Sequence, residues 1–304
     1  MAVVSGEYFD TLNTITADCE PHILREAMEL CAFYDARLSK TIPGTDVWNI
    51  NHADGKTVTV GRDAFVVLET AASLYAASEG AFNVAVGPVI ELWRFNSGKA
   101  EIPDAEKIKK ALRRTDFRQI KLSDGTVTMP AGMMVDLGGI AKGYIADRIA
   151  DHLRARGVDS AVLNFGGNIV TVGNRPDGTP WIVGLQNPYG ERGKDYWAAV
   201  PCADASVVTS GIYERGFEVN GVRYNHFIDP RTGWPVQNGL VSVTAVSGSS
   251  VLADGLTTAM FILGKDRGME LAQQFGAKAA FFFQDGTVSY SSDMGLIWDC
   301  CITH

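Results

Sequence analysis

Three side chains that could carry out acid–base or anion chemistry lie close together in the segment NHFIDPRTGWP. His226 offers a base, Asp229 an acid and Arg231 a cation. The Asp-Pro pair and Gly233 are typical of a tight turn, so this segment is predicted to be a loop. A neutral imidazole could deprotonate a hydroxyl nucleophile, and Asp229 could orient the imidazole or hold a second ligand group. Arg231 could clamp a phosphate. The alternative is structural: His226 ends a strand and Arg231 only holds the turn.

A second candidate cluster lies in the segment SSVLADGLTT, residues 249–258. Asp254 and Thr258 are one helical turn apart in a predicted helix, so their side chains share a face. A carboxylate and a hydroxyl suit Mg²⁺, with water, phosphate and backbone carbonyls as its remaining ligands. Thr257 could replace or assist Thr258. The alternative makes Asp254 a first-turn residue favoured by the helix dipole and Thr258 a packing residue.

Two glycine pairs could let a ligand approach the backbone. The segment VDLGGIAKGY, residues 135–144, follows a predicted strand and opens a helix, where free amides can bind an anion. It matches neither the Walker loop nor the dinucleotide fingerprint, and it could be an ordinary turn capped by Asp136. The pair Gly166-Gly167 is more typical of a tight turn or a bulge between strands. A base, an oxygen-ligand pair and these turns together indicate a metal-assisted phosphate-ester enzyme.

The elements that must position these residues form a pattern of few helices between many short strands. Helices are predicted over residues 21–38, 63–79, 140–156, 250–263 (between a capping serine and Gly264) and 270–275. Strands are predicted over 7–18, 57–60, 117–122, 126–129, 133–135, 160–164, 169–172, 181–185, 197–201, 206–209, 216–219, 223–227, 241–246, 278–284 and 288–290. The segment 80–95 suits a pocket wall better than a regular element. The pattern predicts an α+β fold with mostly antiparallel sheet.

Composition is that of a globular enzyme. The chain has 304 residues, 46% hydrophobic and 20% charged, with a formal net charge of −8. That charge argues against a nucleic-acid binder, and the basic run 107–114 is typical of a solvated helix face. No apolar run approaches a membrane span.

Cysteine usage and the first residues predict the compartment. The chain has five cysteines, an odd count without metal-ligand spacing, which fits a reduced compartment. The N-terminus lacks the pattern of a signal peptide. We therefore expect a cytoplasmic protein, although a chain that had lost an export signal would read the same.

The sequence resembles the FAD:protein FMN transferases of the ApbE family over nearly its whole length. The resemblance is carried, in order, by FDT (residues 9–11), GAFNVAVGPVIELWRF (80–95), VDLGGIAKGYIAD (135–147), SGIYERGFEVNGVRYNHFIDPRTGWP (210–235) and ADGLTTAMFILG (253–264). It implies one ApbE-like domain over 1–304 with a T-fold-related architecture, or two closely packed subdomains with FAD between them. It also implies that the protein cleaves FAD with Mg²⁺, attaches FMN to a threonine of an acceptor flavoprotein and releases AMP.

The resemblance also implies site residues. His226 is expected to be the base that activates the acceptor threonine. Metal ligands are expected at Gly139 (through its carbonyl), Asp254, Thr257 and Thr258. FAD contacts are expected at Phe9, Thr41, Ala81, Phe82, Asn83, Asp136, Lys142 and Ile228.

This chain departs from the family pattern at two of these positions. Asn83 stands where many relatives have Asp, and Thr41 stands where they often have an aromatic residue. Many relatives are also exported lipoproteins, whereas this sequence has no lipobox cysteine.

Two other functions remain open from the residues alone. One is an FAD pyrophosphatase that releases FMN and AMP, and the other is a protein that holds FAD without chemistry. The absence of the dinucleotide fingerprint argues against a nicotinamide oxidoreductase.

Overall fold

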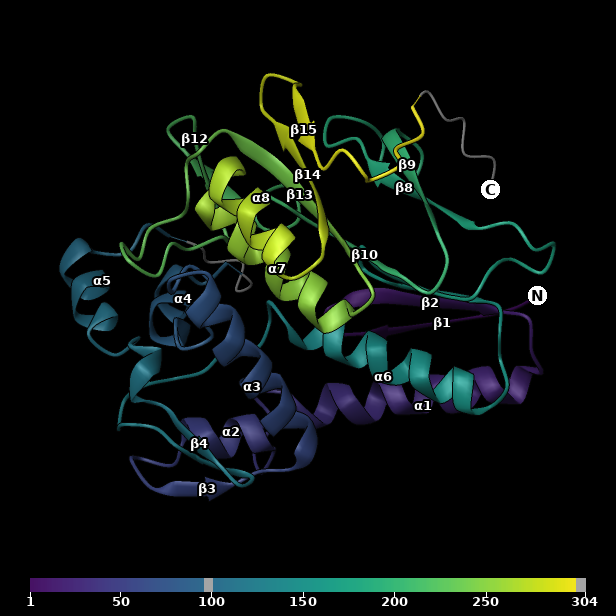
Figure 1. The fold of residues 1–304 in the computed structure, drawn as a ribbon. Helices are drawn as coiled ribbons and strands as arrows, with labels where there is room; N and C mark the ends of the chain where they lie inside the picture. The colour runs from purple at the N-terminus through teal and green to yellow at the C-terminus, as the bar shows by residue number, and fades with distance from the viewer. Residues whose placement is uncertain (96–100, 299–304) are drawn as a thin grey trace.

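An eight-stranded antiparallel sheet forms the centre of the protein, whose computed structural model describes residues 1–95 and 101–298 (Figure 1). In spatial order its strands are β1 (Ala2–Tyr8), β2 (Thr11–Ala17), β6 (Ala161–Phe165), β7 (Asn168–Val172), β10 (Ser206–Gly211), β13 (Leu240–Ser247), β14 (Lys278–Phe283) and β15 (Val288–Tyr290). Every neighbouring pair is antiparallel. The α+β fold predicted from the sequence is confirmed.

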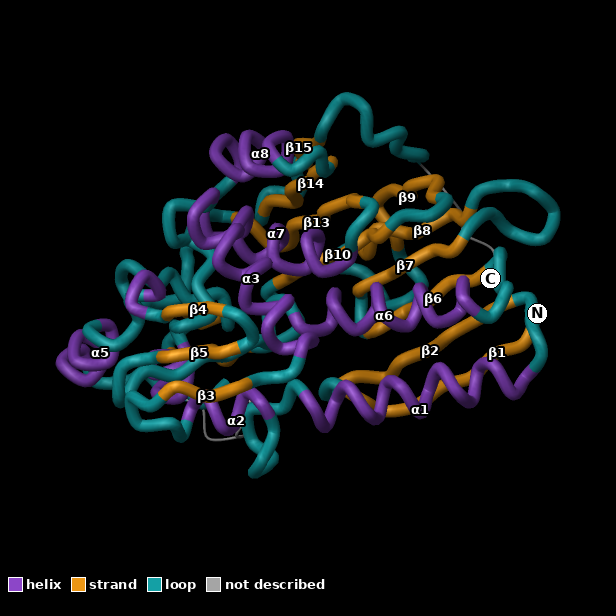
Figure 2. Tube along the Cα trace, turned by 60° about the horizontal axis from the view of Figure 1, so that its bottom comes forward, coloured by secondary structure: helices purple, strands orange, loops and turns teal. Residues whose placement is uncertain are grey.

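Helices cover one face of this sheet. Figure 2 shows α1 (Pro21–Arg37) and α6 (Ala141–Ala155) lying across the end that holds β1, β2 and β6. The other end is covered by α7 (Ser250–Leu263) and α8 (Lys265–Gln274), and α3 (Arg62–Ala77) packs against α7. A layer of helices on a sheet explains why α7 is apolar nearly all round: it is buried between the sheet and α3.

A hairpin covers part of the opposite face. It consists of β8 (Trp181–Gln186) and β9 (Tyr196–Cys202), whose buried side chains pack with Val207, Val246 and Ala280 of the main sheet. Neighbouring residues on a strand point to opposite faces. Because both faces are covered here, β13 is buried along almost its whole length, and its buried residues include the polar Ser242 and Thr244 as well as apolar ones.

A smaller region sits beside the main sheet. Its three-stranded sheet has the order β3 (Thr57–Thr59), β5 (Thr126–Thr128) and β4 (Lys121–Ser123). Around it lie α2 (Asp46–Asn51), α4 (Gly87–Trp93), α5 (Ala105–Leu112) and the 3₁₀ helix η1 (Phe117–Gln119). A separate hairpin, β11 (Gly216–Val219) with β12 (Val222–Asn225), leads directly into His226. One continuous apolar core runs from the small sheet into the main sheet.

Several predicted elements were wrong in extent or type. The predicted strand 7–18 is a hairpin, because Phe9 and Asp10 turn the chain with φ near +56° and +58°. The segment 80–95 contains α4, and the strand predicted over 117–122 begins as η1. The helix predicted over 270–275 extends back to Lys265.

The strand predicted over 133–135 is absent for a specific reason. The side chain of Asn51 takes the place of a neighbouring strand: its Nδ2 donates to the Val135 carbonyl at 2.9 Å, and its Oδ1 accepts from the Val135 amide at 2.8 Å. Among the residues that the structure describes, a single parallel β-bridge, Val86 to Met134, pairs this segment with another part of the backbone. In the described ranges, no helix has the length and apolarity needed to cross a bilayer.

Candidate active site

Asp254 is held deep in the second turn of α7. The helix begins at Ser250, and Asp254 is only 3% exposed. The N-terminus of α7 is instead satisfied by Asp147 of α6, whose carboxylate accepts from the amides of Ser250 at 2.8 Å and Val251 at 3.0 Å. The reading of Asp254 as a first-turn residue is therefore wrong, and so is the expected serine side-chain cap, because the N-cap Ser249 makes no such bond.

The carboxylate of Asp254 faces the start of α6. Its Oδ2 accepts from the Gly143 amide at 2.9 Å, and Lys142 Nζ lies 4.0 Å from its Oδ1. The approach is close because Gly143 has no side chain: a Cβ there would collide with the Ser250 carbonyl and lie 2.8 Å from Asp254 Cβ. The amide and the cation together keep this buried carboxylate paired.

Replacing Gly143 with alanine should therefore destabilise the protein, although alanine is the better helix former. We expect a loss of about 1–3 kcal/mol from the forced separation of α6 and α7. Thermal unfolding of Gly143→Ala against Gly268→Ala measures it. Gly268 is also helical, but a Cβ there meets its nearest neighbour, Phe281, at 3.0 Å, so its loss should be smaller. Equal midpoints in the two variants would contradict the close approach.

The turn that contains Gly138 and Gly139, called the glycine turn below, lies against Thr258. A Cβ placed on Gly139 would lie 3.2 Å from Thr258 Oγ1 and 3.7 Å from Phe82 Cε2. Thr257, by contrast, is fully buried. Its hydroxyl donates to the Asp254 carbonyl at 2.8 Å and lies 2.8 Å from Ser210 Oγ. The structure thus brings Asp254, Thr258 and Gly139 to one junction, with Thr257 behind it.

The donor set at this junction fits a hard cation such as Mg²⁺. Asp254 supplies one carboxylate, Thr258 a hydroxyl and Gly139 a nearby backbone. Magnesium is typically bound by one or two carboxylates and completed by water and substrate phosphates. Across the described part of the chain no three His, Cys, Asp or Glu side chains are grouped to hold a metal.

His226 is poised as a neutral base. Its Nδ1 lies 3.1 Å from the Arg215 carbonyl, which can only accept, so Nδ1 carries the proton and Nε2 keeps its lone pair. Burial lowers the pKa of His226 to about 4, and the positive charges of Arg215 and Lys142 act in the same direction. Lys142 thus lies near both His226 and Asp254. The next residue, Phe227, stacks on Phe261 of α7 at 4.0 Å between ring centroids.

The pH dependence should show this shift. Only neutral His226 can accept a proton, so a lowered pKa extends activity below pH 6.5, the ordinary histidine value. We expect the acid limb of kcat/KM to fall near pH 4, as measured by AMP release over a pH series. Burial of the neutral ring also adds stability that is present above pH 6.5 and is lost as the pH falls toward 4. An acid limb at pH 6.5 would show an ordinary, solvated histidine.

The rest of the segment NHFIDPRTGWP forms a turn whose polar side chains bond to one another. Arg231 donates from Nε and a terminal nitrogen to Asp229 at 2.8 and 2.7 Å. Asp229 also accepts from the Arg231 amide at 2.9 Å, and the Gly233 amide bonds to the Asp229 carbonyl at 2.8 Å. The expectation that Asp229 orients His226 is wrong, since the Arg215 carbonyl does so. Arg231 is bound within the turn.

The expected FAD contacts of the segment 81–83 lie beside the glycine turn. Ala81 and Phe82 are buried. Asn83 donates from Nδ2 to the Thr115 carbonyl at 2.8 Å and accepts from the Ala85 amide at 2.8 Å, so its amide group shapes the local turn. These two bonds occupy the amide group of Asn83 within the protein, and its contact with FAD stays a prediction.

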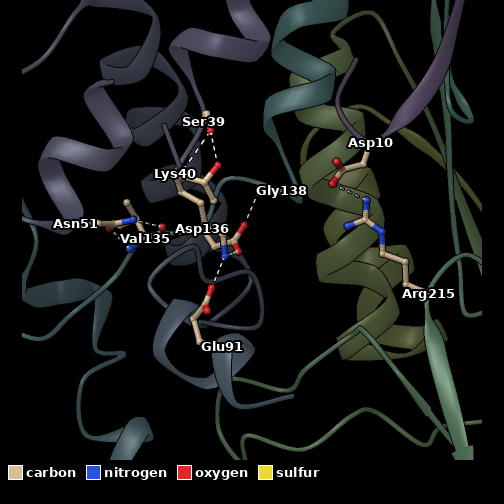
Figure 3. A network of polar contacts seen from close by, with 10 residues as sticks. Asp10, Ser39, Lys40, Asn51, Glu91, Val135, Asp136, Gly138 and Arg215 are labelled. Carbon is tan, nitrogen blue, oxygen red and sulfur yellow. Dashed lines mark hydrogen bonds and ion pairs between the residues drawn. The ribbon is translucent and has the colours of Figure 1, made fainter. Parts of the chain in front are cut away.

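Asp136 is tied to the same turn. Its amide donates to the Val84 carbonyl at 2.7 Å, and its Oδ1 accepts from the Gly138 amide at 2.8 Å. The N-cap of α6 is Ile140, so the interpretation of Asp136 as the helix cap is wrong. Its second oxygen, Oδ2, binds Lys40 at 2.9 Å (Figure 3).

The remaining expected contacts lie in three other segments of the chain. Ile228 is buried in an apolar cluster with Val86 and Val89 of the α4 region. Thr41 is exposed and follows Lys40. Phe9 is half-buried at the β1–β2 turn, with its ring 6.1 Å from that of Phe165. The Gly166-Gly167 pair is the tight turn expected between β6 and β7.

Sequence reasoning missed three residues that organise the site: Lys40, Asp147 and Arg215. Lys40 was missed because no local sequence pattern links it to Asp136, which lies 96 positions away. Arg215 acts on His226 through its carbonyl, which no side-chain motif can reveal, and its guanidinium lies 3.6 Å from Asp10 of the β1–β2 turn (Figure 3). Asp147 lies in the quoted motif 135–147, but its partner amides belong to another helix.

Comparison with known proteins finds relatives over most of the chain. The model of the ApbE family matches residues 9–282. A Treponema pallidum protein named FAD:protein FMN transferase is 40% identical over 257 residues, covering 79% of this chain and 71% of that protein. A Klebsiella pneumoniae protein of the same name is 37% identical over 273 residues, covering 88% and 84%.

Solved structures agree in fold. The crystal structure of an ApbE protein from Thermotoga maritima matches with a TM-score of 0.88 and 29% identity, covering 96% of this chain and 97% of that one. The flavin transferase ApbE from Vibrio cholerae matches with a TM-score of 0.87 and 27% identity over the same shares. The family model, the named relatives and the shared fold lead to one conclusion: this chain belongs to the ApbE family.

Proposed function

We propose that the protein is a Mg²⁺-dependent FAD:protein FMN transferase that attaches FMN to a threonine hydroxyl of an acceptor flavoprotein. The observation that carries the proposal is the pairing of a neutral, oriented base at His226 with an oxygen-rich junction at Asp254, Thr258 and Gly139. Lys142 links the two, because it lies 4.0 Å from Asp254 and its charge acts on His226. The relatives' shared name supports transfer of FMN from FAD to protein.

His226 performs the proton step in this reaction. Its Nε2 takes the proton of the acceptor threonine hydroxyl as that oxygen forms a bond to the FMN phosphorus. The bond between this phosphorus and the bridging oxygen of the pyrophosphate breaks, and AMP leaves with the bridging oxygen. The Arg215 carbonyl keeps Nδ1 protonated and so holds the ring in the tautomer that can accept.

Asp254, Thr258 and the Gly139 carbonyl would hold the metal. Bound Mg²⁺ would neutralise the negative charge of the pyrophosphate. Lys142 adds a second positive charge beside Asp254, and the buried Thr257 braces the helix through its bond to the Asp254 carbonyl. Phe9, Thr41, the segment 81–83, Asp136 and Ile228 would line the FAD site.

The test is incubation of the protein with FAD and Mg²⁺, with and without a flavoprotein acceptor. Mass spectrometry of the acceptor should find FMN added to threonine, with AMP released in equal amount. Rapid AMP release that does not depend on acceptor would instead show an FAD pyrophosphatase. FAD binding without AMP in either arm would show a protein that only holds FAD, and would overturn the proposal.

A further inference from the structure

Lys40 bonds to both Asp136 and Glu91, and so connects three segments that are far apart in the sequence. Lys40 follows α1, Glu91 lies on α4, and Asp136 precedes the glycine turn. Lys40 Nζ donates to Asp136 Oδ2 at 2.9 Å and to Glu91 Oε1 at 2.7 Å (Figure 3). These bonds cross 96 and 51 positions of sequence respectively. The proton transfer and metal ligation described above do not use Lys40.

The two arms of this contact differ in burial. The Asp136 side chain is 16% exposed and Lys40 28%, whereas Glu91 is 54% exposed. Exposed ion pairs contribute little, because water screens them and both side chains lose freedom. Charge-assisted hydrogen bonds with restricted access to water are stronger. The bond between Lys40 and Asp136 is therefore the dominant arm, and Glu91 steadies Lys40 from the rim.

Asp136 passes this restraint to the glycine turn. Its Oδ2 is held by Lys40, while its Oδ1 accepts from the Gly138 amide at 2.8 Å. The next residue, Gly139, lies against Thr258. A carboxylate held at both oxygens has one orientation, so Lys40 fixes the side chain that fixes the turn.

The main chain around Asp136 is held independently of Lys40. The Asp136 amide bonds to the Val84 carbonyl, and both polar groups of Val135 bond to Asn51. Removal of the Lys40 ammonium should therefore leave the backbone folded and release only the carboxylate. This separation makes the role of Lys40 measurable.

We propose that Lys40 is a positioning residue for FAD. It acts through Asp136, whose carboxylate it holds in one orientation between the segment 39–41 and the glycine turn. The inference rests on the proposed function, in which Asp136 contacts FAD. It assigns Lys40 to the binding of FAD, and leaves proton transfer to His226.

Lys40→Met tests this role, since it keeps the length of the side chain and removes its charge. We expect the KM for FAD, and the Kd for FAD measured by flavin fluorescence without Mg²⁺ or acceptor, to rise about tenfold, the scale of a lost charged hydrogen bond. The kcat should change less than about threefold, because the base and metal ligands remain. Lys40→Arg should recover part of the affinity, since it restores a cation that can donate to Asp136.

A double-mutant cycle separates action through Asp136 from a general effect of charge. In the Asp136→Asn background, Lys40→Met should raise the Kd by less than about twofold, because its partner is already neutral. In the Glu91→Gln background it should still cost nearly the full factor. Equal losses from Lys40→Met in the wild-type and Asp136→Asn backgrounds would overturn the proposal.

The controls distinguish this inference from the function on which it rests. Lys56→Met removes an exposed lysine and should leave both constants unchanged. If Lys40→Met lowers the thermal midpoint, the Kd for FAD is compared between Lys40→Arg and Lys40→Gln. The arginine variant, which keeps a cation beside Asp136, should then bind FAD more tightly than the glutamine variant. An unchanged FAD affinity in Lys40→Met refutes the positioning role even when the wild type modifies its acceptor. A wild type that binds FAD but modifies no acceptor refutes the proposed function, and the fluorescence cycle still decides the role of Lys40.

Discussion

Replacement of His226 by alanine is expected to lower kcat for FMN transfer by about 10²–10⁴-fold, the usual contribution of a positioned general base. The physical reason is the loss of Nε2, the lone pair that the Arg215 carbonyl aims by holding Nδ1 protonated. FAD affinity should change much less, because the imidazole acts on the acceptor hydroxyl. The measurement is the initial rate of FMN attachment at saturating FAD, followed by mass spectrometry of the acceptor.

His22→Ala provides the matched control. His22 is an exposed histidine near the start of α1, so its loss should leave the rate unchanged. A His226→Ala enzyme that transfers FMN at the wild-type rate would exclude His226 as the base. A large rise in KM with an unchanged kcat would instead assign the residue to binding.

Replacement of Asp254 by asparagine should be at least as damaging, with kcat/KM reduced about a thousandfold or more. Stabilisation by a bound metal is worth several kcal/mol, and each 1.36 kcal/mol is about tenfold in rate. The fold should survive, because an asparagine oxygen can still accept from the Gly143 amide. The substitution removes the carboxylate charge that, in the proposed function, would attract Mg²⁺.

The measurement for Asp254→Asn is the rate of AMP release as a function of Mg²⁺ concentration. The saturation curve should move to much higher Mg²⁺ or vanish, while thermal unfolding stays near the wild-type midpoint. Asp266→Asn removes an exposed first-turn carboxylate of α8 and should leave the curve in place. A variant at Asp254 with a normal Mg²⁺ response would reject this residue as a metal ligand.

Much of the fold could be predicted because buried helix faces leave a regular spacing of apolar residues in the sequence. The ranges of α6 and α7 follow directly from apolar spacing, and most strands of the main sheet were found within a residue or two. The errors have local causes. The segment 133–135 has strand-like residues, but the side chain of Asn51 satisfies its backbone, and the β1–β2 turn uses left-handed residues that are not glycine.

The sequence by itself determined the chemistry available to this protein: a histidine, a carboxylate–hydroxyl pair one helical turn apart, and a glycine turn. These depend on residue type and short spacing, which a linear chain displays. The tertiary structure alone decided which partner each group has. Asp147 accepts hydrogen bonds from the first amides of α7, 103 positions along the chain, and Lys40 bonds to Asp136 across 96 positions. The Arg215 carbonyl sets the tautomer of His226. The physical reason is that burial and long-range contacts, which set pKa values and orientation, arise only when distant segments pack together.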